Sequence, residues 1–123
     1  MNDRGSATAE LVVVFPFVML LILLVVQFGM WQHAVHVTEV AAAEALAVAR
    51  AHGGSAGAGR AEASSLLSRL GGSVLRSPQV SVSRTAEAAR VQVSGVAPAV
   101  VPFLRLPATT VAYGPVERFR GDR

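Results

Sequence analysis

Glu10 is the side chain of this sequence whose surroundings most suggest a specific interaction. It is an acid at the edge of an apolar run, and the positions one helical turn ahead, Val13 and Val14, offer no cation. If the chain were cut after Gly5, the new α-amine of Ser6 would be a cation. In a packed array that amine would lie within reach of the Glu10 carboxylate of a neighbouring subunit. The alternative is a solvated carboxylate at the headgroup level of a membrane.

The other residues of catalytic or metal-binding type are not spaced for chemistry. His33, His36 and Glu39 follow one another in steps of three, which wind around a helix, whereas a helical zinc pair more often has a spacing of four. The serines of residues 60–70 have no His–acid pair nearby, and no paired carboxylates occur at an active-site spacing. We therefore expect no catalytic residue, no metal site and no cofactor, and we do not expect an enzyme.

Charge and composition argue against further classes of protein. All 11 basic residues are Arg, and with 8 acids the formal net charge is +3. The Arg residues are spread along the chain without a basic stripe that also contains aromatic side chains, so we expect no binding of nucleic acid. Cysteine is absent, which excludes a disulfide framework and cysteine-based zinc or redox sites.

An apolar run over residues 11–31 is the element that positions Glu10. It contains no charged residue, and at 1.5 Å per residue a helix of this length covers roughly 30 Å, the thickness of the hydrocarbon core of a bilayer. The run is longer than the core of a secretory signal, and residues 27–33 offer no small-x-small cleavage site. We therefore predict a retained transmembrane helix over residues 11–31, with Trp31 at the membrane interface.

The flanks and one proline of this run carry further predictions. Arg4 lies on the N-terminal side, whereas the first basic residue beyond the other end is Arg50. This bias predicts a single-pass protein of the cell membrane with a cytoplasmic N-terminus and an extracytoplasmic C-terminal domain. Pro16 removes one backbone donor and clashes with the carbonyl of Val12, so we expect a helix kink at Pro16.

The head and the apolar run together resemble a known family. The type III signal of type IV pilins and pseudopilins consists of a Gly, four further residues, a Glu and an uninterrupted apolar helix. More narrowly, the sequence resembles the TadE-like family, the minor pseudopilins of tight-adherence pilus systems. The resemblance lies in residues 3–10, Phe15-Pro16 and Gln27-Phe28-Gly29. The resemblance extends through Ala49-Arg50. Gln27 departs from the pattern, because relatives often carry Glu there.

The resemblance implies a role in assembly. It implies that a prepilin peptidase cleaves between Gly5 and Ser6, and that Glu10 is the residue of assembly and register. The protein would be a minor pseudopilin or pilus-assembly membrane protein of a tight-adherence (Flp-type) pilus or a related secretion system. Its partners would be the peptidase, other pilins or pseudopilins, the pilus assembly platform and the lipid bilayer, and it would lie in the membrane or in a surface pilus.

A second function remains open at this point. The apolar run could serve only as a tether, in a single-pass membrane protein that is not processed as a pilin. The C-terminal part would then be an extracytoplasmic binding module. Retention of the first five residues in a cell with a working peptidase would favour this alternative.

These signals divide the chain into six parts. We expect a polar head at 1–10, a transmembrane helix at 11–31, an extramembrane continuation of that helix at 32–52, a Gly-rich linker at 53–59, a small outer domain at 60–116 and a charged tail at 117–123. The continuation contains neither Gly nor Pro and is rich in Ala, and Val37, Ala41 and Ala45 form a modest apolar stripe along it.

The outer domain is predicted to contain a short helix over 60–70 and strands at 79–84, 90–96 and 108–113, because the apolar period changes from helical to two. The Pro-studded apolar segment 97–107 either covers the sheet or meets a partner. We favour covering, since a sheet of three strands needs one face buried. The predicted fold class is α+β, with a long N-terminal helix, half of it transmembrane, followed by a short helix and a small antiparallel β-sheet.

Overall fold

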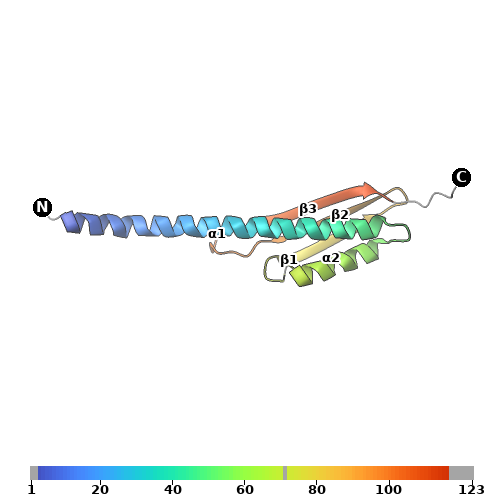
Figure 1. The fold of residues 1–123 in the computed structure, drawn as a ribbon, viewed down its shortest axis with the longest axis horizontal. Helices are drawn as coiled ribbons and strands as arrows, with labels where there is room; N and C mark the ends of the chain where they lie inside the picture. The colour runs from blue at the N-terminus through green and yellow to red at the C-terminus, as the bar shows by residue number, and fades with distance from the viewer. Residues whose placement is uncertain (1–2, 71, 117–123) are drawn as a thin grey trace.

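The computed structural model describes residues 3–70 and 72–116, so residues 1–2 of the predicted head and the predicted tail 117–123 lie outside the described residues. The elements are α1 (Asp3–Arg50), α2 (Ala56–Leu70), β1 (Arg76–Arg84), β2 (Ala88–Val96) and β3 (Pro107–Pro115). The predicted α+β class is confirmed. Figure 1 shows α1 as a long rod, with α2 and the strands gathered along its C-terminal half.

α1 changes character at Gln27. Its 48 residues give a length of about 70 Å. Residues 5–26 are exposed, and only 6% of the most apolar 18-residue window is buried. From Gln27 onward one side is buried, at Gln27, Ala34, Val37, Thr38, Ala41, Ala42, Ala45 and Ala49. Among residues 3–70 and 72–116, no other element packs on the N-terminal half of α1, which fits a single-pass membrane anchor, and the C-terminal half is a core helix.

Pro16 does not interrupt α1. The helix continues on both sides of it. Figure 1 shows α1 as one continuous rod, and the helix kink at Pro16 stays a prediction. The pyrrolidine ring still removes the N–H that would bond the carbonyl of Val12.

The turn between the helices is shorter than the sequence suggests. Gly53 has a φ of 79°, a left-handed value that ends α1 after Arg50. The Oγ of Ser55 then accepts a hydrogen bond from the N–H of Ala58 at 3.0 Å, which is the geometry of an N-cap. α2 therefore begins at Ala56, and the predicted Gly-rich linker at 53–59 is helical in its second half.

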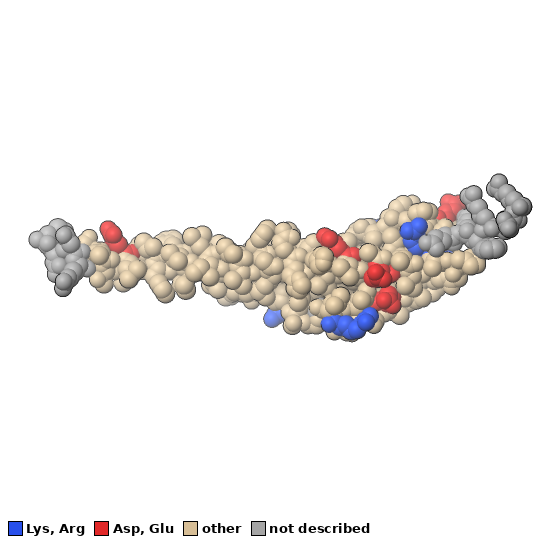
Figure 2. All heavy atoms as spheres, viewed as in Figure 1, with Lys and Arg blue, Asp and Glu red and all other residues tan. Residues whose placement is uncertain are grey.

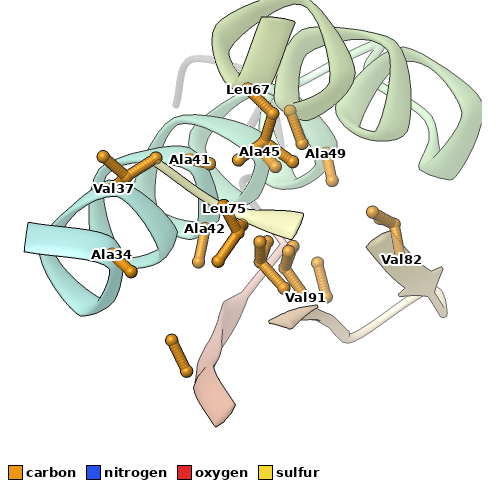
Figure 3. Packing of buried hydrophobic residues seen from close by; sticks show 14 of the residues in the cluster. Ala34, Val37, Ala41, Ala42, Ala45, Ala49, Leu67, Leu75, Val82 and Val91 are labelled. Atoms are coloured by element: carbon orange, nitrogen blue, oxygen red, sulfur yellow. The ribbon is translucent and has the colours of Figure 1, made fainter. Parts of the chain in front are cut away.

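Gly59 is a packing residue and not part of a linker. A Cβ at Gly59 would lie 2.9 Å from the carbonyl oxygen of Ala45 and 3.0 Å from the Cβ of Ala49. Only a glycine allows the two helices to approach this closely. Figure 3 shows Ala45 near Leu67 of α2, so the Ala-rich side of α1 faces α2 of the same chain.

The three strands form an antiparallel sheet in the order β1–β2–β3, which lies against the helices. β2 and β3 pack mainly on α1, and β1 packs mainly on α2. Val82, Val91 and Val93 point into the core, so the predicted alternation in the first two strands is confirmed. A hydroxyl pair crosses the helix–sheet interface, where the Oγ1 atoms of Thr38 and Thr110 lie 2.8 Å apart.

The segment between β2 and β3, residues 97–106, extends beside α1 toward its N-terminal half (Figure 1). Ala97 and Leu106, at its ends, join the core, but its middle is hydrogen-bonded to Gln27 of α1. The prediction that this segment covers the sheet holds only at its two ends, where Ala97 and Leu106 join the core. The long helix and α2 already occupy the buried face of the sheet, so the segment docks on α1 instead.

Candidate assembly and membrane-interface site

The predicted cleavage bond lies in the first turns of α1. Gly5 and Ser6 are both exposed, and a Cβ added at Gly5 would meet nothing within 4 Å. The bond lies in the first turn of α1, which begins at Asp3, and the N–H groups of a first turn lack acceptors within the helix. Opening the backbone around the Gly5–Ser6 bond therefore breaks few helical hydrogen bonds.

Glu10 lies one turn further along the same rod. It is exposed, and it shares a shallow surface depression with Ser6, Ala9, Val13 and Val14. These neighbours are small or apolar. Figure 2 shows an acidic side chain near this end of the molecule and then a long surface without charge. A cation that approaches from another molecule would therefore find the carboxylate open and in weakly polar surroundings.

Gln27 is a fully buried polar side chain in the last third of the apolar run, with 1% of its surface exposed. Its Nε2 donates to the carbonyl oxygen of Pro98 at 3.0 Å. Its Oε1 accepts the N–H of Val100 at 2.7 Å and that of Val101 at 3.3 Å. One amide thus satisfies three backbone groups of the segment 97–106, each of which would be costly to leave unpaired next to hydrocarbon.

The bonding around Gln27 requires an amide. A carboxylate at this position would still accept from Val100 and Val101, but it has no N–H to donate to the carbonyl of Pro98. Gln27 is therefore the position that couples α1 to the segment 97–106. The sequence did hold a signal for this role, because a lone amide in an apolar run needs a partner.

Trp31 provides a second link between α1 and the same part of the chain. Its Nε1 donates to the carbonyl oxygen of Pro107, at the start of β3, at 3.0 Å. Its ring lies beside that of Phe28, with the centroids 5.7 Å apart and the planes tilted by 45°. Trp31 lies about 6 Å beyond Gln27 along the helix axis. Its place at the membrane interface stays a prediction, and its bond to Pro107 was not foreseen.

The histidines of α1 do not gather with acids. His33 and His36 are exposed, as is Glu39. Among residues 3–70 and 72–116, no group of three or more His, Asp or Glu side chains is placed to hold a metal ion. Gly5, Glu10, Gln27 and Trp31, the residues discussed above, all lie along α1.

Comparison with known proteins supports the resemblance seen in the sequence. The family model described as TadE-like protein matches residues 5–46. The match contains Gly5, Glu10, Pro16, Gln27 and Trp31 and ends within the core half of α1, so the chain is similar to TadE-like proteins over this segment. No curated protein and no solved structure matches the chain.

Proposed function

We propose that this protein is a minor pseudopilin, or a pilus-assembly membrane protein, of a tight-adherence (Flp-type) pilus or a related secretion system. The observation that carries the proposal is the N-terminal half of α1. Its side chains from residue 5 to 26 are all exposed, apolar for the most part and headed by Glu10, and they lie inside the TadE-like match. Such a helix needs lipid or other helices around it, which supports a role in the membrane and in assembly.

The first step of the proposed mechanism is hydrolysis of the Gly5–Ser6 bond by a prepilin peptidase. Water adds across the peptide, which releases residues 1–5 with a carboxylate on Gly5 and leaves a free α-amine on Ser6. The exposed position of this bond at the start of α1 supports the step, since the peptidase must reach the backbone.

The second step is pairing of the new amine with Glu10 of a neighbouring subunit. In a medium of low dielectric constant such a pair is strong, and a mismatch leaves both charges buried without a partner. Ser6 and Glu10 are four residues apart, which corresponds to about 6 Å along a helix. Neighbouring α1 helices would therefore be staggered by about that distance, and this offset would be the axial register of the assembly.

The proposed topology places the head in the cytoplasm and α2 with the sheet outside. The bias between Arg4 and Arg50 supports this orientation. The partners in the proposal are the prepilin peptidase, other pilins or pseudopilins, the assembly platform and the bilayer.

The second candidate is a single-pass anchor that is not processed and that presents an extracytoplasmic binding module. One observation favours it, namely the outer face of the sheet, where Val111 and Tyr113 are exposed by 49% and 71%. The TadE-like match ends at residue 46 and does not include this sheet.

The mass of the membrane-purified protein separates the two candidates. The chain is expressed with a prepilin peptidase, both as wild type and as Gly5→Ala, beside a pilin that the same cells process. We expect the wild type to lose residues 1–5 and Gly5→Ala to keep them. An intact wild type next to a processed control pilin would contradict cleavage and favour the unprocessed anchor.

A further inference from the structure

Phe103 is the most exposed large apolar side chain of the described residues, with 87% of its surface accessible. It lies at the tip of the segment 97–106, between Pro102, which is also exposed, and Leu104, which is half-buried. An aromatic ring held in water in this way gains nothing from folding. An apolar environment that buries the Phe103 ring must therefore come from outside the chain.

The hydrogen bonds of Gln27 fix the position of this tip along the axis of α1. Val100 and Val101 are bonded to Gln27 directly, and Gln27 lies about 6 Å on the apolar side of Trp31. The segment thus lies beside the end of the apolar run and not beyond it. The surface that surrounds the run at this height, for example Val25 and Phe28, is exposed and apolar as well.

The backbone of the segment is suited to an environment without water. Pro98 and Pro102 have no N–H to satisfy. The N–H of Ala97 bonds the carbonyl of Leu106 at 3.0 Å, and that of Leu104 bonds the carbonyl of Val101 at 3.1 Å. Gln27 satisfies three further groups. Irregular backbone near a membrane must be covered by protein, so these bonds hold the backbone of the segment against α1 and leave its side chains to face outward.

We propose that Pro102, Phe103 and Leu104 insert into the leaflet of the bilayer that lies next to the outer domain, so that lipid acyl chains surround the Phe103 ring. Arg105 follows the tip and is exposed, which places a guanidinium beside the lipid phosphates. The protein then holds the membrane at two points, the α1 span and this loop, and Gln27 joins them. The proposal rests on the span of α1 and not on cleavage or pilus assembly.

The test uses the full-length chain in phospholipid vesicles at low protein-to-lipid ratio. Because the sequence has no cysteine, one cysteine can be labelled with an environment-sensitive fluorophore without background. The labelled variants are Phe103→Cys, Val25→Cys as a control inside the span, and Glu87→Cys as a control in the exposed turn between β1 and β2. Vesicles with and without nitroxide-labelled acyl chains are compared.

We expect the label at position 103 to emit at shorter wavelength and to be quenched by the nitroxide lipids nearly as strongly as the label at position 25. The label at position 87 should stay unquenched. Quenching at 25 but not at 103 would overturn the loop insertion and leave the span intact. A blue-shifted but unquenched label at 103 would mean that a second copy covers the tip, and the proposal would again be wrong. An absence of quenching at all three positions would contradict both the transmembrane span of α1 and the insertion of the loop.

Discussion

The Oε1 of Gln27 accepts the N–H of Val100 at 2.7 Å, across 73 residues of sequence. This bond joins the apolar half of α1 to the segment between β2 and β3, and the amide nitrogen of the same side chain bonds Pro98. The membrane anchor and the outer domain are therefore linked by specific polar contacts in addition to the continuous helix.

Gln27→Ala should weaken the outer domain. The substitution leaves the N–H of Val100 and the carbonyl of Pro98 without partners, and each buried group left in this way costs about 1–3 kcal/mol. The free energy of unfolding, measured in detergent by circular dichroism against denaturant, should fall accordingly.

Gln27→Glu is the sharper variant, because it keeps the acceptor, loses the N–H that donates to Pro98 and places a carboxyl group at a buried position. At equal detergent and salt we expect a larger loss at neutral pH than at acid pH, where the protonated carboxyl can donate to Pro98. Gln32→Ala, an exposed amide on the same helix, is the control and should stay within about 0.5 kcal/mol of wild type. Equal stability of all three variants would show that the amide does not hold the segment.

Gly59→Ala should destabilise the contact between α1 and α2. Its Cβ would lie 2.9 Å from the carbonyl oxygen of Ala45, so the helices must move apart, at a cost of about 1–3 kcal/mol. Gly57→Ala is a matched control in the same helix, since the nearest atom to its Cβ is the Ser55 Oγ at 3.9 Å. It should raise stability by about 0.5–1 kcal/mol through helix propensity. In thermal unfolding, the Tm of Gly59→Ala should fall and that of Gly57→Ala should rise. Shifts of Tm in the same direction would contradict the close approach of the two helices.

The Thr38–Thr110 pair predicts a non-additive mutant cycle. Thr38 is fully buried, and its hydroxyl lies 2.8 Å from that of Thr110. Thr38→Val should cost about 1–3 kcal/mol because it leaves the Thr110 hydroxyl without this partner, whereas replacement of both residues by Val should be nearly neutral. Denaturant titrations of the two single variants and the double variant give the coupling energy. Strict additivity would mean that the two hydroxyls do not act as a pair.

Glu10→Gln should leave the isolated protein folded and reduce its assembly. The side chain is exposed, so circular dichroism of the purified variant should match wild type. Loss of the carboxylate leaves the neighbouring amine unpaired, which in a buried pair costs about 3–5 kcal/mol. Glu44→Gln removes an exposed acid from the same helix and should assemble normally. The yield of cross-linked membrane complexes measures the assembly of each variant. Equal yields for Glu10→Gln and Glu44→Gln would refute the register role of Glu10.

Much of this fold was predictable because its signals are local. The apolar run, the period of two in β1 and β2 and the helical spacing in α2 are set by near neighbours in sequence, and the structure follows them. The start of α2 was missed because a cap at Ser55 outweighs the low helix propensity of Gly57 and Gly59.

The docking of the segment 97–106 was missed for a different reason. Its partner, Gln27, lies more than 70 residues away in sequence, and a periodic pattern of apolar residues carries no information about so distant a contact. The residues of the candidate site show the same difference between local and long-range signals. Gly5 and Glu10 were found from spacing and resemblance, whereas the bonds of Gln27 required coordinates, although the lone amide was visible.

The absence of a break in α1 has a mechanical consequence. The same helix that forms the anchor packs against α2 and all three strands, so the outer domain behaves as the end of a lever arm. From Gln27 to Arg50 the arm is about 35 Å long. A tilt of about 20° within the bilayer, an ordinary value for a membrane helix, would carry the far end of the arm sideways by about 12 Å. Membrane thickness, or the packing of neighbouring spans, would in this way set the direction in which the sheet faces.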